Sequence, residues 1–153
     1  MAGIQIQLGD TQSIRQVLNQ LLKQTEQLRP AFEDIGEHLQ LSHRQHFDQQ
    51  QSPQGEAWQA LSPSTQALKP KLQDQILRLN DILRDHLSYQ ANDEQLLFGS
   101  NQVYAAMMQF GGTTSPNSMI PNVEIPARPF LGINQDDEQA IFEILNQHLS
   151  AAL

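Results

Sequence analysis

A run of apolar residues that is interrupted by a proline constrains the fold of this chain more than any other feature. Between residues 14 and 39, apolar side chains recur every three or four positions, which is the spacing of one face of a helix. Pro30 falls inside the run, and a proline in the middle of a helix costs about 3 kcal/mol because it removes a backbone hydrogen bond and clashes with the preceding turn. The pattern therefore predicts two amphipathic helices that join at Pro30, the second of which extends to around residue 49.

A coiled coil is the alternative interpretation of the same run. The positions that carry it are Ile14, Leu18, Leu21, Thr25, Leu28, Phe32, Ile35 and Leu39. They also fit a heptad repeat, which would make the chain an interaction or regulatory protein that binds a partner helix through residues 14–39. Two helices packed within one subunit are favoured, because Pro30 suits the first turn of a new helix.

The middle of the chain is predicted to alternate loops with short elements. Residues 50–64 form the main flexible loop, and Trp58, the only tryptophan, is expected to anchor it to the core or to a partner. Apolar residues at helical spacing predict a helix over 73–87, after a short one over 65–69 that Ser62 or Ser64 would cap. Two apolar stretches on either side of the turn-forming sequence ANDE then predict a hairpin.

A further short helix is predicted over residues 102–110. Its apolar face would consist of Val103, Ala106, Met107 and Phe110. Residues 111–118 are expected to form a second flexible loop, because Gly111 and Gly112 admit backbone angles that other residues avoid. Prolines confine the extended segment 119–127 to a sheet edge or an irregular strand.

The start of the last helix is marked by a capping box. Asn134 stands at the N-cap position with Asp137 three residues later, and the acidic run 136–138 suits the positive end of the helix dipole. Together the elements predict an α+β fold: amphipathic helices packed on a small, mostly antiparallel sheet, with a C-terminal helix. The 153 residues are expected to form a single domain, 1–153, in which residues 1–9 are a short strand or a flexible leader.

Composition and charge argue against several classes of protein. The chain has no cysteine, which excludes disulfides, thiolate metal sites and a cysteine nucleophile. A net charge of −8 argues against a protein whose main role is to bind nucleic-acid phosphates. No stretch approaches the roughly 18 consecutive apolar residues of a membrane span, and the N-terminus lacks the pattern of a signal peptide. We therefore expect no membrane partner and no secretion by a signal peptide.

No motif in the sequence predicts catalysis or metal binding. His43 and His46 share one helical face but His38 does not, so ordinary surface histidines are favoured over a metal site. The carboxylates of residues 136–138 are direct neighbours that do not face one another, and helix capping explains them. The familiar nucleophile, zinc and phosphate-loop motifs are absent from the sequence. No catalytic, cofactor-binding or metal-binding residue is predicted; a hydrolase or metalloenzyme is the alternative that a bound metal would reveal.

A proline-stiffened segment, residues 124–133 (the proline strap), leads into the last helix. Pro126 and Pro129 restrict the backbone on either side of Arg128, so its guanidinium is held in one direction. Two roles fit this placement: binding carbonyls or a carboxylate of its own chain, or contacting a neighbouring subunit or partner. Spacing alone favours the internal role. Phe130 is expected to fix the start of the last helix.

Four blocks of the sequence, in this order, resemble one known family. The first covers residues 29–69, and its marks are Phe47, Gly55, Trp58, Leu61, Thr65 and Lys69. The second is ILRLNDILRDHLSY at 76–89, and the third, at 98–112, is marked by Gly99, Tyr104, Ala105, Phe110 and Gly111. The fourth is IPARPFLGI at 125–133, before an acidic helix start. Together, over residues 28–149, they resemble the phage virion morphogenesis family, the tail-completion proteins of Mu-like and P2-like phages.

Two departures from the family pattern concern local structure. Asn80 and Asp81 stand where the family often has Thr-Gly, which bears on the turn geometry there. Residues 108–111 read Met-Gln-Phe-Gly where the family often has His-Gln-Phe-Gly. A histidine at that point is therefore not required for any chemistry.

The resemblance implies a structural, non-enzymatic protein that acts late in tail assembly. Such proteins cap the finished tail tube at its head-proximal end and make it competent to join the filled head, and the implied form is a hexameric ring. The implied partners are other copies of the chain, the tail tube and head–neck proteins; DNA would pass through the ring without sequence-specific binding. The implied location is the host bacterial cytoplasm and then the tail–neck region of the virion. A head-side neck connector or adaptor is the alternative.

The candidate assembly-interface residues lie in the proline strap and in the aromatic and glycine-bearing blocks. They are Arg128, Pro126, Pro129, Phe130, Trp58, Tyr104, Phe110, Gly111 and Gly112. All of them are expected to serve protein–protein contact, and no cofactor is expected.

Overall fold

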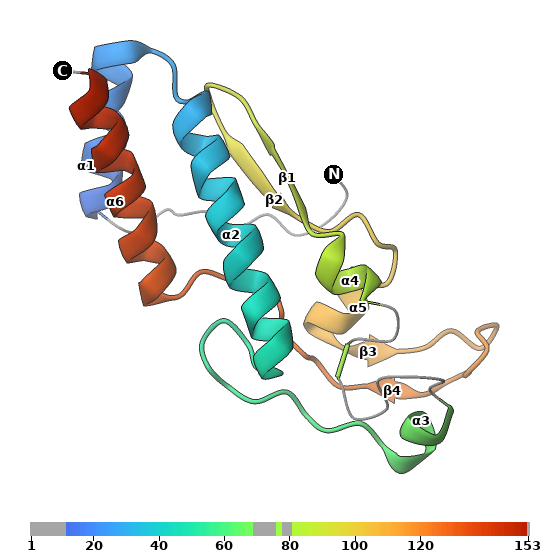
Figure 1. The fold of residues 1–153 in the computed structure, drawn as a ribbon. Helices are drawn as coiled ribbons and strands as arrows, with labels where there is room; N and C mark the ends of the chain where they lie inside the picture. Colours follow the sequence, from blue (N-terminus) through green and yellow to red (C-terminus); the bar gives the residue numbers. More distant parts are fainter. Residues whose placement is uncertain (1–11, 69–75, 78–80, 153) are drawn as a thin grey trace.

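The computed structural model describes residues 12–68, 76–77 and 81–152, and it has an α+β fold (Figure 1). The helices are α1 (Gln12–Thr25), α2 (Arg29–Gln49), α3 (Pro63–Leu68), α4 (Ile82–Asp85), α5 (Ala105–Phe110) and α6 (Gln135–Ala152). The strands are β1 (Ser88–Ala91), β2 (Leu96–Gly99), β3 (Gly112–Thr113) and β4 (Glu124–Ile125). β1 pairs with β2 and β3 pairs with β4, both antiparallel. The predicted fold class, with its antiparallel pairing and C-terminal helix, is confirmed. The expected leader, residues 1–9, lies outside the described residues.

α1 and α2 are two separate helices, as the interrupted apolar run predicts. α1 ends at Thr25, and Glu26 then adopts a left-handed backbone with φ 52°. α2 begins at Arg29, so Pro30 lies in its first turn, where the missing N–H is not needed. The alternative of one coiled-coil helix across Pro30 is wrong, because the chain turns at this point and most of the apolar run is buried in the subunit's own core.

The core lies where α1, α2 and α6 meet. α6 packs against both α1 and α2, and the β1–β2 hairpin lies along α2 (Figure 1). The largest fully buried apolar side chains are Phe47, Phe130, Ile14, Leu21, Ile35, Ile141 and Leu145. Each side chain of this kind stabilises the fold by roughly 1.5–3 kcal/mol through burial. The helices with the clearest apolar periodicity in the sequence therefore supply most of the core.

The hairpin is confirmed, and a glycine lets it approach α2 closely. Tyr89 pairs with Phe98 in the antiparallel register, and Asn92 in the turn accepts hydrogen bonds from two backbone N–H groups. Gly36 of α2 faces the Tyr89 ring so closely that a Cβ atom there would lie 2.5 Å from it. The ring occupies the space that any larger residue at position 36 would need.

The helix predicted over residues 73–87 is wrong in its described part. Only α4 is helical there, because Leu77 and Asp81 adopt left-handed backbone angles, with φ 59° and 54°. Residues 73–75 and 78–80 lie outside the described residues. Ile76 and Leu83 are nevertheless buried, so these apolar positions of the predicted helix do contact the core.

The other short elements differ from their predictions in position or orientation. α5 begins at Ala105, three residues later than expected, and it buries Ala105 while Val103 and Phe110 of the predicted apolar face are exposed. α3 begins at Pro63, and the Ser62 hydroxyl accepts the Thr65 N–H at 3.3 Å, which confirms Ser62 as its cap.

The two segments expected to be flexible loops contain regular backbone contacts. Residues 112–113 form β3, within the expected loop 111–118, and pair with β4. In the expected loop 50–64, Gln51 forms an isolated antiparallel bridge with Ala57. Their flexibility in solution stays a prediction.

Candidate assembly site

Arg128 holds the proline strap against its own subunit. Its Nε donates to the carbonyl of Gln59 at 2.8 Å and its Nη2 to that of Ala60 at 3.2 Å. Its backbone N–H donates to the carbonyl of Met108 in α5 at 2.8 Å. The side chain is only 7% exposed, and burial lowers the pKa of its guanidinium. The sequence left two roles open for Arg128, and these contacts correspond to the internal one. The guanidinium binds the strap to the loop before α3.

Trp58 and Phe130 join the same loop and strap to the core. The Trp58 indole N–H donates to the carbonyl of Pro129 at 2.7 Å, across 71 positions of sequence. Phe47 of α2 contacts both rings, and its centroid lies 5.3 Å from that of Trp58 and 5.7 Å from that of Phe130. Phe130 is completely buried. Trp58 therefore anchors its loop to the core, which is one of the two alternatives that the sequence offered.

Gln109 is a residue of this site that the sequence did not single out. Its side-chain carbonyl accepts the backbone N–H groups of Phe130 and Leu131 at 2.9 and 3.0 Å, and its amide donates to the Leu131 carbonyl at 3.2 Å. One amide group thus pairs with the strap as a neighbouring strand would. Glutamines are so frequent in this chain that composition gives no signal for this one.

Gly111 and Gly112 lie where α5 passes close to the strap. At Gly111, with φ 71°, a Cβ would lie 2.7 Å from the backbone of Ile125 and Ala127. At Gly112 the φ of 151° also favours glycine, and a Cβ would meet the Met107 sulfur at 3.0 Å. Both glycines thus have a role inside the subunit, whatever they contact in an assembly.

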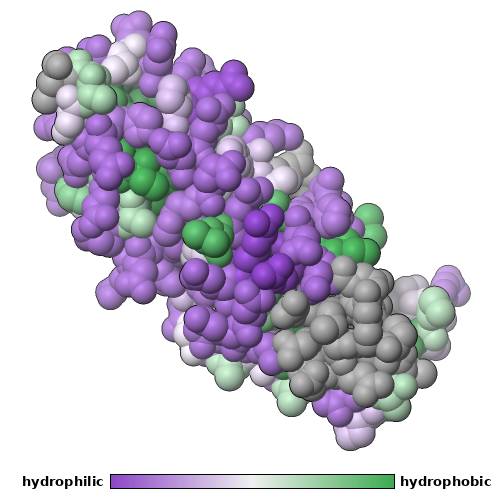
Figure 2. All heavy atoms as spheres, in the orientation of Figure 1, coloured by the Kyte–Doolittle hydropathy of each residue, from purple (hydrophilic) through white to green (hydrophobic). Residues whose placement is uncertain are grey.

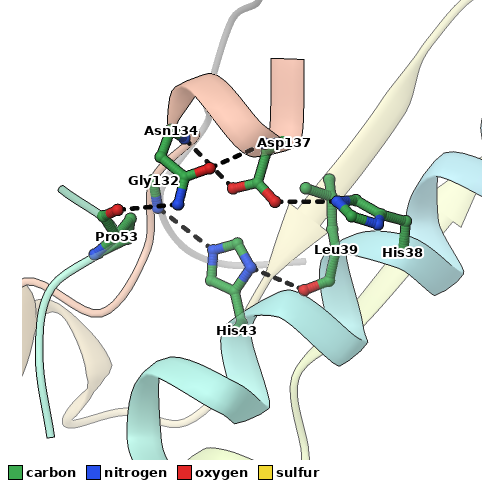
Figure 3. A network of polar contacts seen from close by, with 7 residues as sticks. All are labelled: His38, Leu39, His43, Pro53, Gly132, Asn134 and Asp137. Carbon is green, nitrogen blue, oxygen red and sulfur yellow. Dashed lines mark hydrogen bonds and ion pairs between the residues drawn. The ribbon is translucent and has the colours of Figure 1, made fainter. Parts of the chain in front are cut away.

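A second polar cluster fixes the start of α6, on the far side of the strap (Figure 3). The predicted capping box is confirmed: the Asp137 N–H donates to Asn134 Oδ1 at 2.8 Å, and the Asn134 N–H donates to Asp137 Oδ2 at 3.2 Å. Asp137 also binds His38 Nε2 at 2.9 Å, and the Asn134 amide donates to the Pro53 carbonyl at 3.0 Å. The cluster thus connects α6 to α2 and to the loop after α2.

His43 is a structural histidine inside this cluster. Its Nδ1 donates to the Leu39 carbonyl at 2.7 Å, and its Nε2 accepts the Gly132 N–H at 3.3 Å (Figure 3). Burial lowers the pKa of His43 to about 4, so the ring is neutral at pH 7. The expectation of surface histidines is wrong for His43 and His46, which both lie buried where α2 passes under the strap. Among the described residues, no group of three or more side chains could hold a metal ion.

The opposite end of the molecule carries a groove, which we call the apolar groove, with a volume of about 630 Å³. It lies between the loop before α3, α4, α5 and the segment 120–128. Tyr104 lines it, as do Pro126 and Arg128 of the strap. The site thus brings Arg128, Trp58 and Phe130 together as internal anchors. Of the other candidates, Phe110 is exposed at this end without lining the groove, and Pro129 is exposed on the strap.

Comparison with known proteins identifies the chain's family. The model of the phage virion morphogenesis family matches residues 9–150. This chain belongs to the phage virion morphogenesis family. The resemblance stated from the four sequence blocks is therefore confirmed, and the match extends to residues before the first of them.

Relatives of this virion morphogenesis protein come from Mu and Mu-like prophages. It is 34% identical over 116 residues to the "Putative capsid assembly protein G" of Escherichia phage Mu, covering 73% of each chain. It is 28% identical over 145 residues to the "Mu-like prophage FluMu G protein 2" of Haemophilus influenzae, covering 95% of each. No solved structure matches it. None of its described helices is long and apolar enough to cross a membrane.

Proposed function

We propose that this protein completes the phage tail by forming a ring at the head-proximal end of the tail tube, to which the filled head then joins. The observation that carries the proposal is the family match over nearly the whole chain, together with an end that exposes apolar side chains on α5 and the β3–β4 hairpin. In this role the protein is structural and needs no catalytic group or cofactor. Its partners are other copies of itself, the tail tube and neck proteins.

Charge and location fit this role. A ring that DNA must cross should not retain phosphates, and a subunit with a net charge of −8 repels them. The protein would be made in the host bacterial cytoplasm and remain in the tail–neck region of the virion. Six subunits would match the sixfold symmetry of a tail.

A head-side connector is the second candidate. The observation in its favour is the name of the Mu relative, which refers to capsid assembly. A connector would bind the head portal before any tail is present, whereas a tail-completion protein would bind the tail tube first. The two candidates therefore differ in the order of binding.

An order-of-addition experiment separates them. The gene for this chain is deleted from its phage, the mutant is induced, and heads and tails are purified separately from the lysed cells. The purified protein is incubated with one of them, unbound protein is removed, and the other is added. We expect joined particles by electron microscopy only after incubation with tails. Joining only after incubation with heads would overturn the tail-completion proposal in favour of the connector.

A further inference from the structure

Apolar side chains that the fold does not use are exposed on and next to α5 and at the tip of the β3–β4 hairpin. Val103 and Met119 are 99% and 102% exposed, and Phe110 is 66% exposed. Figure 2 shows hydrophobic atoms along this edge of a face that is otherwise mostly hydrophilic. Exposed apolar side chains of this size are available to bind a partner, and contiguous ones mark interaction sites. This end is therefore a candidate contact surface.

The charge pattern indicates what binds there. Between Glu94 and Glu124 the sequence has no aspartate, glutamate, lysine, arginine or histidine, although the chain carries a net charge of −8. We call residues 95–123 the uncharged segment. Two copies of an acidic chain repel one another over most of their surfaces, and like charges brought together across an interface are costly. The uncharged segment is the part of one copy that another copy can cover without that cost.

The apolar groove offers a receptor of matching chemistry. Leu61, Ile82 and Val123 are among its apolar lining residues, and the charged residues among those of its lining that the structure describes, Glu124 and Arg128, have opposite signs. No carboxylate among the described residues forms an ion pair with Arg128. Its guanidinium has five donors. Two of them bind Gln59 and Ala60, so the others can serve a carbonyl that enters the groove.

The tip of the β3–β4 hairpin has a fixed conformation that could bind in such a groove. The Thr114 N–H donates to the Val123 carbonyl at 2.9 Å, the Val123 N–H donates to Thr114 Oγ1 at 2.8 Å, and Thr114 Oγ1 donates to the Ile120 carbonyl. These bonds hold the tip in one conformation before binding, which lowers the entropy lost on association. Ile120 lines the groove of its own subunit, whereas its neighbour Met119 does not line it and is fully exposed.

We propose that the hairpin tip of one copy, led by Met119, seats in the apolar groove of the next copy. Met119 does not line the groove of its own subunit, so its seat in the groove of the next copy is a head-to-tail contact, and such contacts form rings when the rotation closes. The inference rests on the proposed function, because it names the surfaces through which that ring would form.

Cysteine cross-linking tests the contact, because the natural chain has no cysteine. The double variant carries Met119→Cys at the tip and Ala60→Cys in the groove wall. A disulfide forms only where the two Cα atoms come within about 7 Å. After oxidation with diamide, a non-reducing gel should show a ladder of two, three and more linked copies. The experiment is run on the purified protein and on lysates of cells that are assembling virions.

Matched controls make the ladder specific. Either single variant can form at most a dimer, and a mixture of the two should give dimers only. The pair Leu41→Cys with Ala60→Cys should give no ladder, since Leu41 is exposed on α2 outside the uncharged segment. A second variant, Met119→Asp, should weaken self-association by at least about tenfold, because it places a charge in an apolar groove, and Leu41→Asp should not.

The outcomes separate this inference from the proposed function. Absence of a ladder in both samples would overturn the head-to-tail contact. The single Met119→Cys variant can form only a dimer that is linked tip to tip. If this dimer forms in the same yield as the dimer from the mixed single variants, the head-to-tail contact is also overturned. If heads still join tails in cells that make the ladder-negative double variant, the tail-completion role stands with a different partner in the groove. If the ladder forms but particles join only after incubation with heads, the head-to-tail contact between copies is retained and the tail-completion role is wrong.

Discussion

Burial decides what the polar residues of this protein do. Arg128 and His43 both belong to residue types that usually face water, yet each is enclosed where the proline strap crosses α2 or α5. Each then binds backbone groups: Arg128 donates to two carbonyls, and His43 bridges a carbonyl and an N–H. Both side chains therefore bind groups of their own subunit, and substitution or titration of either one should change the stability of the fold.

The buried His43 predicts a loss of stability in acid. Its pKa is about 4 in the folded protein because burial disfavours the charged ring, and about 6.5 in the unfolded chain. Above pH 6.5 both states are neutral, so the full stability is present. Between 6.5 and 4 the unfolded state takes up the proton first, and the free energy of unfolding should fall by about 3 kcal/mol. Urea denaturation followed by circular dichroism across this range measures the loss.

The variant His43→Gln is the control for this slope. Burial also lowers the pKa of His46, so some acid sensitivity should remain in the variant. The part of the slope that belongs to His43 should disappear. Identical pH dependence in the two proteins would show that His43 does not titrate in this way.

Arg128→Ala should destabilise the subunit by about 1–3 kcal/mol. The substitution leaves the carbonyls of Gln59 and Ala60 without their donors and frees the strap from the loop before α3. The control is Arg29→Ala, which breaks an ion pair with Glu33 between two largely exposed side chains and should cost much less. Equal unfolding free energies for Arg128→Ala and the natural protein would mean that the guanidinium acts elsewhere, in contact with another subunit.

The elements meet at positions where a single side chain fills the contact. Phe130→Ala should cost about 3–5 kcal/mol, because the ring is fully buried against Phe47 where the strap reaches the core. Phe110→Ala removes the same ring from an exposed position on α5 and should change stability by less than about 0.5 kcal/mol. Denaturant unfolding of both variants gives the comparison, and similar losses in the two would contradict the assignment of Phe130 to the core.

The crossing of α2 and the β1–β2 hairpin predicts a steric effect. Gly36→Ala should destabilise by about 1–3 kcal/mol, because the new methyl group would lie 2.5 Å from the Tyr89 ring. The loss should shrink when Tyr89→Ala is present as well, since the clash needs both side chains. Additive losses in the double variant would show that the two elements do not meet at these residues.

Long elements were predictable because each buries one face over many residues. The apolar run, Pro30 and the capping box at Asn134 are local signals, and the structure confirms all three. Short elements were not predictable, because tertiary contacts set them. α5 is oriented by the bonds that Met108 and Gln109 make to the strap, which no apolar spacing can reveal. Leu77 adopts a left-handed backbone angle, which its residue type does not indicate because glycine is the residue that usually does so.

Only the local part of the candidate site could be predicted from the sequence, because its tertiary contacts leave no local pattern. The two prolines marked the strap, but its partners at Gln59 and Ala60 are backbone carbonyls, which carry no sequence signal. The exposed end had one available signal, the long interval without aspartate, glutamate, lysine, arginine or histidine that ends at Glu124. Such an interval in an acidic chain indicates a contact surface even before a structure is known.

The two ends of the molecule have different roles. At one end α1, α2 and α6 form the packed core. At the other end α5, the β3–β4 hairpin and the apolar groove lie next to the strap (Figure 1). The core end keeps the subunit folded, and the other end exposes uncharged, apolar surface. This arrangement suits a subunit that repeats around a ring, because assembly contacts can form without disturbing the core.

Electron microscopy of particles made without this protein tests the central claim most directly. The gene is deleted from the phage that encodes the chain, lysis is induced, and joined particles, free heads and free tails are counted. Tail completion predicts DNA-filled heads and separate tails, with almost no joined particles, and restoration of joining when the protein is supplied from a plasmid. Joined particles in normal number, or a lysate without filled heads, would contradict it.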